Sequence, residues 1–433
     1  MTDRASSQKG EQTHPARWVP TLYFAEGIPF YAVSVIASIF YKRMGVADDV
    51  NALYTSWLLL PWSLKPLWSP LLEMFRTKRF FVVLLEFLGG LSLALVALCV
   101  HLPQYFGVTL GLFLLVAVCS STHDIAADGL YIGSLTEKQQ AAYAGWQGGF
   151  YNAARFFSQG GLLILAGYLE LRSGVPRAWM VIFGAMGGVT IAVSLWHARV
   201  LPANEAARHA GNLSEMAATF RDVVATFFRK PHIWLLLAFI FLYRMGEGQA
   251  VKIGPLFLLA TRANGGLGLT TDQVGLFNTV ATVAFIAGSV LGGYFTSWLG
   301  LRRSLLALAC AMNFRLLAWV YLSAVLPANY GAIGIALSLD ALGYGFGFVG
   351  VILLMMQEIA PGKYQTAHYA FATALMNLGL MAPGIVSGKI EMWLGYRAFF
   401  LWVLVSAIPA VAMARFLPLR RKAPEEALQA AEV

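Results

Sequence analysis

The sequence has 433 residues, of which 58% are hydrophobic and only 12% are charged, and its formal net charge is +9. A soluble protein of this length needs more charged residues for its surface, and the composition therefore indicates an integral membrane protein. The positive charge suits anionic lipid headgroups, and nothing in its distribution indicates nucleic-acid binding. The three cysteines (Cys99, Cys119 and Cys310) all lie in apolar stretches, so no disulfide framework and no metal site is expected.

Apolar runs of about 18 residues or more, enough to cross roughly 30 Å of hydrocarbon as an α-helix, recur along the chain. The expected fold class is therefore all-α, a polytopic membrane protein. Twelve transmembrane helices are predicted at residues 18–41, 50–72, 80–102, 107–131, 142–169, 177–198, 232–261, 272–297, 303–326, 329–358, 364–388 and 396–417.

One long interruption divides these spans into two groups of six. Residues 1–198 are predicted to form an N-terminal bundle, 199–231 a linker, and 232–433 a C-terminal bundle. Within the linker, Asn212 and Glu215 are spaced as a capping pair, which predicts an amphipathic helix on the membrane surface. Its apolar stripe is expected to consist of Leu213, Met216, Phe220, Val223, Val224 and Phe227.

The loops differ in their content of Lys and Arg. If both termini are cytoplasmic, the inner segments hold nineteen of these residues and the outer loops seven. Since cytoplasmic loops are enriched in positive charge, both ends of the chain are predicted to face the cytoplasm.

An internal repeat supports the division into two halves. Ser69, Glu73, Arg76, Lys78 and Arg79 recur 224 positions later as Gly293, Ser297, Gly300, Arg302 and Arg303. Lys138, Gln140, Ala142 and Asn152 recur 225 positions later as Lys363, Gln365, Ala367 and Asn377. A six-plus-six duplication with basic loops after the second and eighth helices resembles the major facilitator superfamily, in which two six-helix bundles rock about a central cavity.

Several segments also resemble the AmpG muropeptide permeases, which belong to the wider peptide/acetyl-coenzyme A transporter group. The segments are FAEGIPF (24–30), LKPLWSPLLE (64–73), THDIAADGLY (122–131), FFRKPHIWLLLAFIFLYRMGEG (227–248) and YQTAHYAFATAL (364–375). The resemblance implies proton-driven import of anhydro-muropeptides across the bacterial inner membrane. The coupling ion would be H⁺, with no other cofactor, and the partner would be a small glycopeptide-like solute. A monomer is expected.

Asp124 and Asp128 lie one turn apart inside the fourth span. Ionisable side chains within a membrane are costly and usually mark a pathway or a proton relay, and two neighbouring carboxylates disfavour each other's ionisation. We therefore predict them as the proton-coupling residues, which is also the aspartate pair that the AmpG pattern regards as essential. The alternative is a structural pairing with loop residues near Lys138. Glu26, followed by Gly27 and a helix-loosening Pro29, is a second candidate proton site.

Arg155 lies near the middle of the fifth span and has no nearby acid in the sequence. Since an Arg fork holds a carboxylate with two bonds, a substrate carboxylate is the predicted counterion. The AmpG pattern tends to place Tyr-Arg where this chain has Tyr151 and Asn152, so the arginine is shifted by one turn, which puts the exact substrate in doubt. Tyr151 and Trp146 are candidates for stacking on sugar rings, although such aromatics more often serve packing.

Each of the other ionisable residues within the predicted spans has two possible roles. Arg244 with Glu247, and Arg315 with Asp340, either bind substrate or neutralise each other as ion pairs that fix helix packing. Lys65 either lines the inner vestibule or reaches the headgroups. His123, beside Asp124, either relays protons or is a hydrogen-bonded packing residue.

The sequence carries no convincing enzyme motif. Gly345, Gly347 and Gly350 form a GxGxxG pattern, but it lies inside a predicted membrane helix with no preceding strand, so close helix packing is expected. The leading hypothesis is a proton-coupled importer of peptidoglycan fragments. The alternatives are import of another bulky solute (a siderophore, a glycan fragment or acyl-coenzyme A), a non-transporting membrane sensor or an intramembrane transferase.

Overall fold

A computed structural model describes residues 14–75, 77–202 and 213–419, and within these residues every regular element is helical. The first half comprises η1 (Pro15–Arg17), α1 (Val19–Tyr31), η2 (Ala32–Ile36), α2 (Ala37–Arg43), α3 (Asp48–Trp57), α4 (Leu60–Phe75), α5 (Lys78–Cys99), α6 (Tyr105–Ser134), α7 (Glu137–Arg155), η3 (Phe156–Gly161), α8 (Leu162–Ser173) and α9 (Val175–Val200). After α10 (Leu213–Phe228), the second half comprises α11 (Ile233–Leu259), η4 (Arg262–Asn264), α12 (Thr271–Leu299), α13 (Leu301–Phe314), α14 (Leu317–Val325), α15 (Tyr330–Leu354), η5 (Met355–Ile359), α16 (Gln365–Ser406) and α17 (Ile408–Ala414).

Each predicted span coincides with a helix or a run of consecutive helices. Among the described residues, eight helices are long and apolar enough to cross a membrane, or nine if α10 and α11, bent by 83°, are counted together. The predicted spans 50–72 and 142–169 are helical too, but each is divided into shorter helices (α3 and α4, and α7, η3 and α8), and 232–261 is α11. The last two spans share α16, which is broken at Gly395, where φ is 69°. The all-α, polytopic prediction is confirmed.

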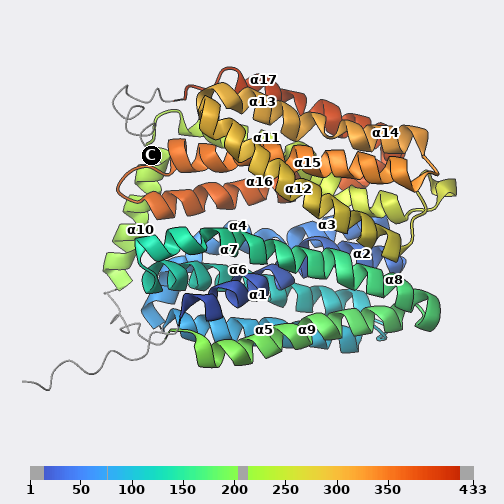
Figure 1. Ribbon diagram of the computed structural model, residues 1–433, viewed down its shortest axis with the longest axis horizontal. Helices are drawn as coiled ribbons and strands as arrows, with labels where there is room; N and C mark the ends of the chain where they lie inside the picture. Colours follow the sequence, from blue (N-terminus) through green and yellow to red (C-terminus); the bar gives the residue numbers. More distant parts are fainter. Residues whose placement is uncertain (1–13, 76, 203–212, 420–433) are drawn as a thin grey trace, which may run out of the picture.

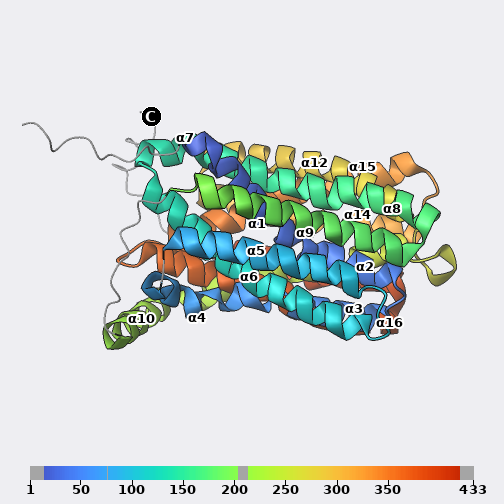
Figure 2. The same cartoon turned by 90° about the horizontal axis from the view of Figure 1, so that it is seen from below.

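The helices form two bundles that lie side by side (Figure 1). One bundle contains α1 to α9 and the other α11 to α17, and both views place α10 at the same end of the molecule (Figures 1 and 2). We call this the linker end, and the opposite end, at the loop between α2 and α3, the far end. The predicted linker helix is present as α10, although residues 203–212 and the side chains of Leu213, Glu215 and Met216 lie outside the described part.

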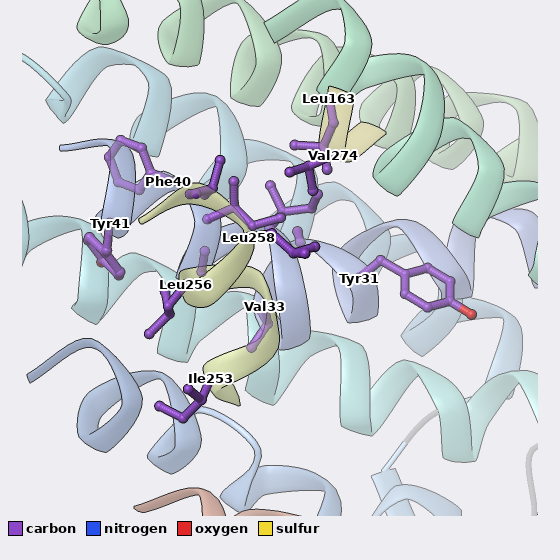
Figure 3. Packing of buried hydrophobic residues seen from close by; sticks show 14 of the residues in the cluster. Tyr31, Val33, Phe40, Tyr41, Leu163, Ile253, Leu256, Leu258 and Val274 are labelled. Carbon is purple, nitrogen blue, oxygen red and sulfur yellow. The ribbon is translucent and has the colours of Figure 1, made fainter. Parts of the chain in front are cut away.

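The hydrophobic core differs between the two ends. Toward the far end, one cluster of buried side chains includes residues of both bundles, such as Val33, Phe40, Leu163, Ile253 and Leu256 (Figure 3). At the linker end each bundle has its own cluster. One gathers around Trp18, Leu22 and Leu130, and the other around Phe227, Ile240 and Leu354. The two bundles are thus sealed together at the far end and have separate cores at the linker end.

Polar contacts reinforce this far-end seal. The Glu170 carboxylate accepts from Arg43 of its own bundle and from the Thr271 hydroxyl of the other, each at 2.8 Å. The Tyr396 hydroxyl donates to Asp48 at 2.5 Å across the interface. Close approach of α12 to α8 depends on Gly275, because a Cβ there would lie 2.7 Å from the backbone nitrogen of Ile164.

Two sequence features shape the first helix. Pro29 lies inside α1 and the π-helix η2 follows directly, as expected where proline removes a backbone donor. Gly27 allows α1 to pack tightly on α7, since a Cβ there would lie 2.6 Å from the Cβ of Ala154 and 3.1 Å from the carbonyl oxygen of Tyr151. This contact brings the residue before it, Glu26, toward the interior of the bundle.

Candidate functional site

Three carboxyl groups and a lysine meet inside the N-terminal bundle. Glu26 comes from α1, Lys65 from α4, and Asp124 with Asp128 from α6. Lys65 Nζ donates to Asp124 Oδ2, and the carboxyl groups of Glu26 and Asp124 lie next to each other. The predicted proton-coupling residues are therefore brought together, and we call these four residues the carboxylate cluster.

The contact between Glu26 and Asp124 has a chemical consequence. Ionised carboxylates only accept hydrogen bonds, so a bond between two carboxyl groups requires a proton on one of them. The Glu26 side chain is buried, and its Oε2 makes no hydrogen bond to any described residue. The cluster thus has room for a proton beside the positive charge of Lys65.

Lys65 does not reach outward to the headgroups, and its place along the inner vestibule stays a prediction. Its ammonium turns inward to Asp124, and the exposed fraction of both side chains is 17%. The long methylene stem of lysine can reach either outward or inward, and here the inward carboxylate provides the stronger partner. The alternative in the sequence analysis was that the aspartates pair with loop residues near Lys138. In the structure, the partner of Asp124 is Lys65. The side chain of Lys138 itself lies outside the described part.

Asp128 lies one turn closer to the linker end than Asp124. The Tyr23 hydroxyl donates to its Oδ1 at 3.2 Å, yet the residue remains exposed. Asp128 is thus the exposed member of the cluster, and it lies on the side of the linker end, where the two bundles have separate hydrophobic cores.

An aromatic group lies next to the cluster. Tyr151 packs against Tyr31, with ring centroids 5.5 Å apart, and against Phe30 at 6.1 Å, and Phe30 contacts Trp62 at 5.3 Å. Trp146, one of the predicted sugar-stacking residues, is 45% exposed and stacks on Phe150 at 6.0 Å. Tyr151 is thus partly committed to packing, while part of the Trp146 side chain is exposed.

Arg155 faces the opposite bundle. Its guanidinium carbon lies 4.9 Å from the centroid of the Phe285 ring on α12, and its buried Nε has no hydrogen-bond partner among the described residues. Asn152, one turn earlier, donates its amide to the carbonyl of Gly148 in its own helix at 2.9 Å.

The two pairs of buried charges predicted in the C-terminal bundle are both ion pairs. Arg244 Nη1 lies 2.8 Å from Glu247 Oε2, and Arg315 Nη1 lies 2.6 Å from Asp340 Oδ1. Both arginines also lie near the Tyr344 ring or hydroxyl, so each is held by neighbours within the C-terminal bundle. Arg244 and Glu247 therefore form the ion pair expected of a packing role. Their role in substrate binding stays a prediction.

The glycine pattern in α15 has the packing role predicted for it. A Cβ on Gly347 would lie 2.5 Å from the Cβ of Met312, and one on Gly350 would lie 3.1 Å from the Tyr243 hydroxyl. These contacts join α15 to α13 and α11, so the motif brings helix backbones together.

Several buried ionisable residues of the described part were not singled out in the sequence, among them Glu86, His197 and Lys252. Glu86 on α5 contacts His123 and also His197 on α9, and Lys252 on α11 is 1% exposed. Depth within an apolar run is the signal that identified Arg155 and Glu247, and it applies equally to Glu86 and Lys252.

Comparison with known proteins gives consistent matches over most of the chain. Residues 21–367 match the family model described as Major Facilitator Superfamily. A "Putative transporter AmpG 4" of Rickettsia conorii is 22% identical over 92% of this chain and 94% of the relative. The "Anhydromuropeptide permease" of Escherichia coli K12 is 24% identical over 90% of this chain and 77% of the relative. Among solved structures, one described under substrate recognition in proton dependent oligopeptide transporters has a TM-score of 0.68 at 14% identity, covering 93% of this chain and 98% of that one.

Proposed function

Because the chain belongs to the Major Facilitator Superfamily, we propose that it imports anhydro-muropeptides, the turnover fragments of peptidoglycan, together with protons. Family and relatives make it a multi-pass membrane transporter of a small molecule and not an enzyme. The substrate, the proton coupling and a location in the bacterial inner membrane with both termini cytoplasmic are the parts that we propose. On this topology the linker end is the cytoplasmic end.

The carboxylate cluster is the observation that carries the proposal. A proton shared by Glu26 and Asp124, next to the ammonium of Lys65, keeps the local charge close to neutral. Loss of that proton leaves additional negative charge in a medium of low dielectric, which favours rearrangement of the helices that supply these groups. Since they come from α1, α4 and α6, the protonation state acts directly on the packing of the N-terminal bundle.

The conformation supports a direction for the cycle. The far-end seal separates the cluster from one side of the membrane, while Asp128 is exposed toward the linker end. A transporter in this state releases its solute and its proton at the linker end, and then returns with the linker end closed. The linker end is cytoplasmic on the predicted distribution of Lys and Arg, so this state is inward-facing, the state from which an importer releases its solute.

The substrate assignment has two supports. The relatives that match nearly the whole chain include a permease named for anhydromuropeptide. Arg155 offers an unpaired guanidinium at the bundle interface, which suits the carboxylates of a peptide stem, and the neighbouring Tyr151 and the exposed Trp146 offer rings to sugar faces.

The test is uptake by purified protein in liposomes. Radiolabelled anhydro-muropeptide is supplied outside under an inward proton gradient, with intact protein, Asp124→Asn and Asp128→Asn. We expect gradient-dependent accumulation by the intact protein and at least a tenfold loss in both variants. The matched control is Asp222→Asn, which removes a half-exposed carboxylate on α10 and leaves accumulation unchanged. Uptake of another solute without muropeptide would overturn the substrate, and uptake indifferent to the gradient would overturn the coupling.

A further inference from the structure

A second group of ionisable side chains lies beside the carboxylate cluster. His123 Nε2 is 3.0 Å from Glu86 Oε1, and His197 Nδ1 is 2.8 Å from both oxygens of Glu86. His197 Nε2 is in turn 2.8 Å from the Thr21 hydroxyl. The three ionisable residues are at most 3% exposed, and with Thr21 they come from α6, α5, α9 and α1.

The hydrogen bonds allow this group to hold an additional proton. The Thr21 hydroxyl can donate either to the carbonyl of Trp18 at 3.1 Å or to His197 Nε2 at 2.8 Å, so both neutral tautomers of His197 fit their neighbours. When Thr21 donates to Trp18, Nε2 carries the hydrogen, and the contact between His197 Nδ1 and Glu86 then needs one further proton, on the ring or on the carboxyl group. A protonated form of the Glu86–His197 pair is therefore compatible with the surrounding contacts.

The other end of the group is ready to accept a proton. With Nε2 of His123 directed at Glu86, the ring leaves Nδ1 as a free acceptor. This Nδ1 is buried and makes no hydrogen bond to any described residue. His123 directly precedes Asp124 in α6, so the free acceptor belongs to the residue next to the cluster.

The group is also arranged along the membrane normal. Thr21 lies two residues after the start of α1, and His197 three residues before the end of α9, both at the linker end. Glu26, which neighbours Asp124 in the cluster, lies five residues after Thr21 on α1, hence roughly 7.5 Å deeper at 1.5 Å per residue. Thr21 is partly exposed. Consecutive hydrogen bonds thus connect the neighbour of Asp124 to the surface.

We propose that His123, Glu86, His197 and Thr21 form the exit route of the coupled proton, which leaves through the N-terminal bundle and not through the space between the bundles that the solute uses. This inference rests on the proton coupling proposed above. A proton from the cluster binds His123 Nδ1, the proton on His123 Nε2 passes to Glu86, and the Glu86–His197 pair gives up the proton on His197 Nε2. Thr21 takes that proton and releases its hydroxyl proton to water, so each group gains one proton and loses one.

A proton route and a purely structural cluster predict different effects of mutation on two transport activities, counterflow and gradient-driven accumulation. Exchange of labelled for unlabelled solute across the membrane, called counterflow, requires no net movement of protons, whereas accumulation driven by a proton gradient does. Variants that block the route therefore keep counterflow and lose accumulation. A group that merely holds α1, α5, α6 and α9 together affects both activities in proportion, because its loss disturbs the whole bundle.

The experiment uses the full-length protein in liposomes that contain a pH-sensitive dye, with radiolabelled anhydro-muropeptide as the probe. For Glu86→Gln and His197→Gln we expect counterflow within about twofold of the intact protein and at least tenfold less gradient-driven accumulation and solute-linked acidification. The matched control is Ser194→Ala, which removes a buried hydroxyl that bridges α9 to the Val83 carbonyl of α5 at 2.8 Å but carries no ionisable proton. It should keep both activities.

Each other outcome overturns the inference. Unchanged accumulation in Glu86→Gln and His197→Gln contradicts the route, as does parallel loss of counterflow and accumulation in proteins that unfold at the same temperature as the intact chain. Should these variants fail to fold, Thr21→Val, at the partly exposed end, must still slow accumulation several-fold without slowing counterflow. If the intact protein accumulates muropeptide without acidification, the proposed proton coupling itself fails, which distinguishes that failure from failure of the route.

Discussion

Arg155 provides the sharpest test of substrate recognition by a single residue. Arg155→Lys keeps the positive charge but loses the planar fork, so we expect KM for a muropeptide with a free peptide carboxylate to rise about tenfold, since hydrogen bonds to charged groups contribute roughly 1.5–3 kcal/mol. Initial rates of uptake measure this, and kcat should change little because the contact is made on binding.

A matched comparison comes from the same helix. Asn152→Ala removes an amide that bonds only within its own helix turn, to the carbonyl of Gly148, and should leave KM within about twofold. Amidation of the peptide carboxylate should abolish the difference between the intact protein and Arg155→Lys. An equal effect of Arg155→Lys on both substrates would contradict carboxylate binding at this position.

For single residues, the sequence identified the ionisable side chains of the candidate site, but it did not identify the side chains that they contact. Asp124 and Asp128 were recognisable because charges are costly within an apolar run. The partner of Asp124, Lys65, lies 59 positions away in sequence, and its long side chain is equally compatible with an inward or an outward direction. The pairing of Glu86 with His197 joins residues 111 positions apart, and only the packing of α5 on α9 brings them together. Periodicity carries no information on such contacts.

The contact of α1 with α7 is the element-level feature that positions Glu26. Gly27→Ala should lower the thermal unfolding temperature, because its Cβ would lie 2.6 Å from that of Ala154, and overpacking typically costs about 1–3 kcal/mol. This outweighs the roughly 1 kcal/mol by which alanine favours a helix over glycine. The measurement is thermal unfolding in detergent. The control is Gly27→Ala combined with Ala154→Gly, which vacates the space and should recover most of the loss. Undiminished stability of the single variant would show that α1 and α7 can separate without cost.

Elements were predictable from the sequence to different degrees. Long apolar helices such as α5 and α12 coincide closely with their predicted spans, since length and hydropathy determine them. Interruptions were predictable only in part. The break at Gly395 falls between the predicted spans 364–388 and 396–417, whereas the π-helices η2 and η3 were not predicted. Pro29 is a local signal for η2, which begins three residues after it.

For the whole molecule, the duplication in the sequence predicted two bundles, which the family membership and the all-helical structure support. The sequence could not predict which end of the molecule is closed. Both conformations of an alternating-access transporter bury nearly the same apolar residues within each bundle, and they differ mainly in contacts between bundles. Here those contacts, such as Asp48 with Tyr396 and Glu170 with Thr271, lie at the far end.

Lys252 allows the stability of that closed end to be tested. Its ammonium donates to the carbonyl of Thr55 at 3.0 Å and of Ser34 at 3.4 Å, both in the other bundle, and its stem packs near Gly384. Lys252→Ala removes these bonds and leaves a polar cavity that water can enter, so we expect the far end to open more often.

The opening can be followed with a cysteine at Ser56, which is fully buried in the seal opposite Gly384. A membrane-impermeant maleimide should label Ser56→Cys at least tenfold faster in the Lys252→Ala background, equivalent to about 1.4 kcal/mol in the opening equilibrium. Lys389→Ala is the control, because Lys389 lies on α16 toward the same end but is exposed, and it should not change the labelling rate. Equal labelling with and without Lys252 would mean that the apolar cluster alone keeps the two bundles closed. The polar residues of the seal would then only complete one another's hydrogen bonds. The free energy of opening would instead come from apolar contacts such as those of α8 with α12.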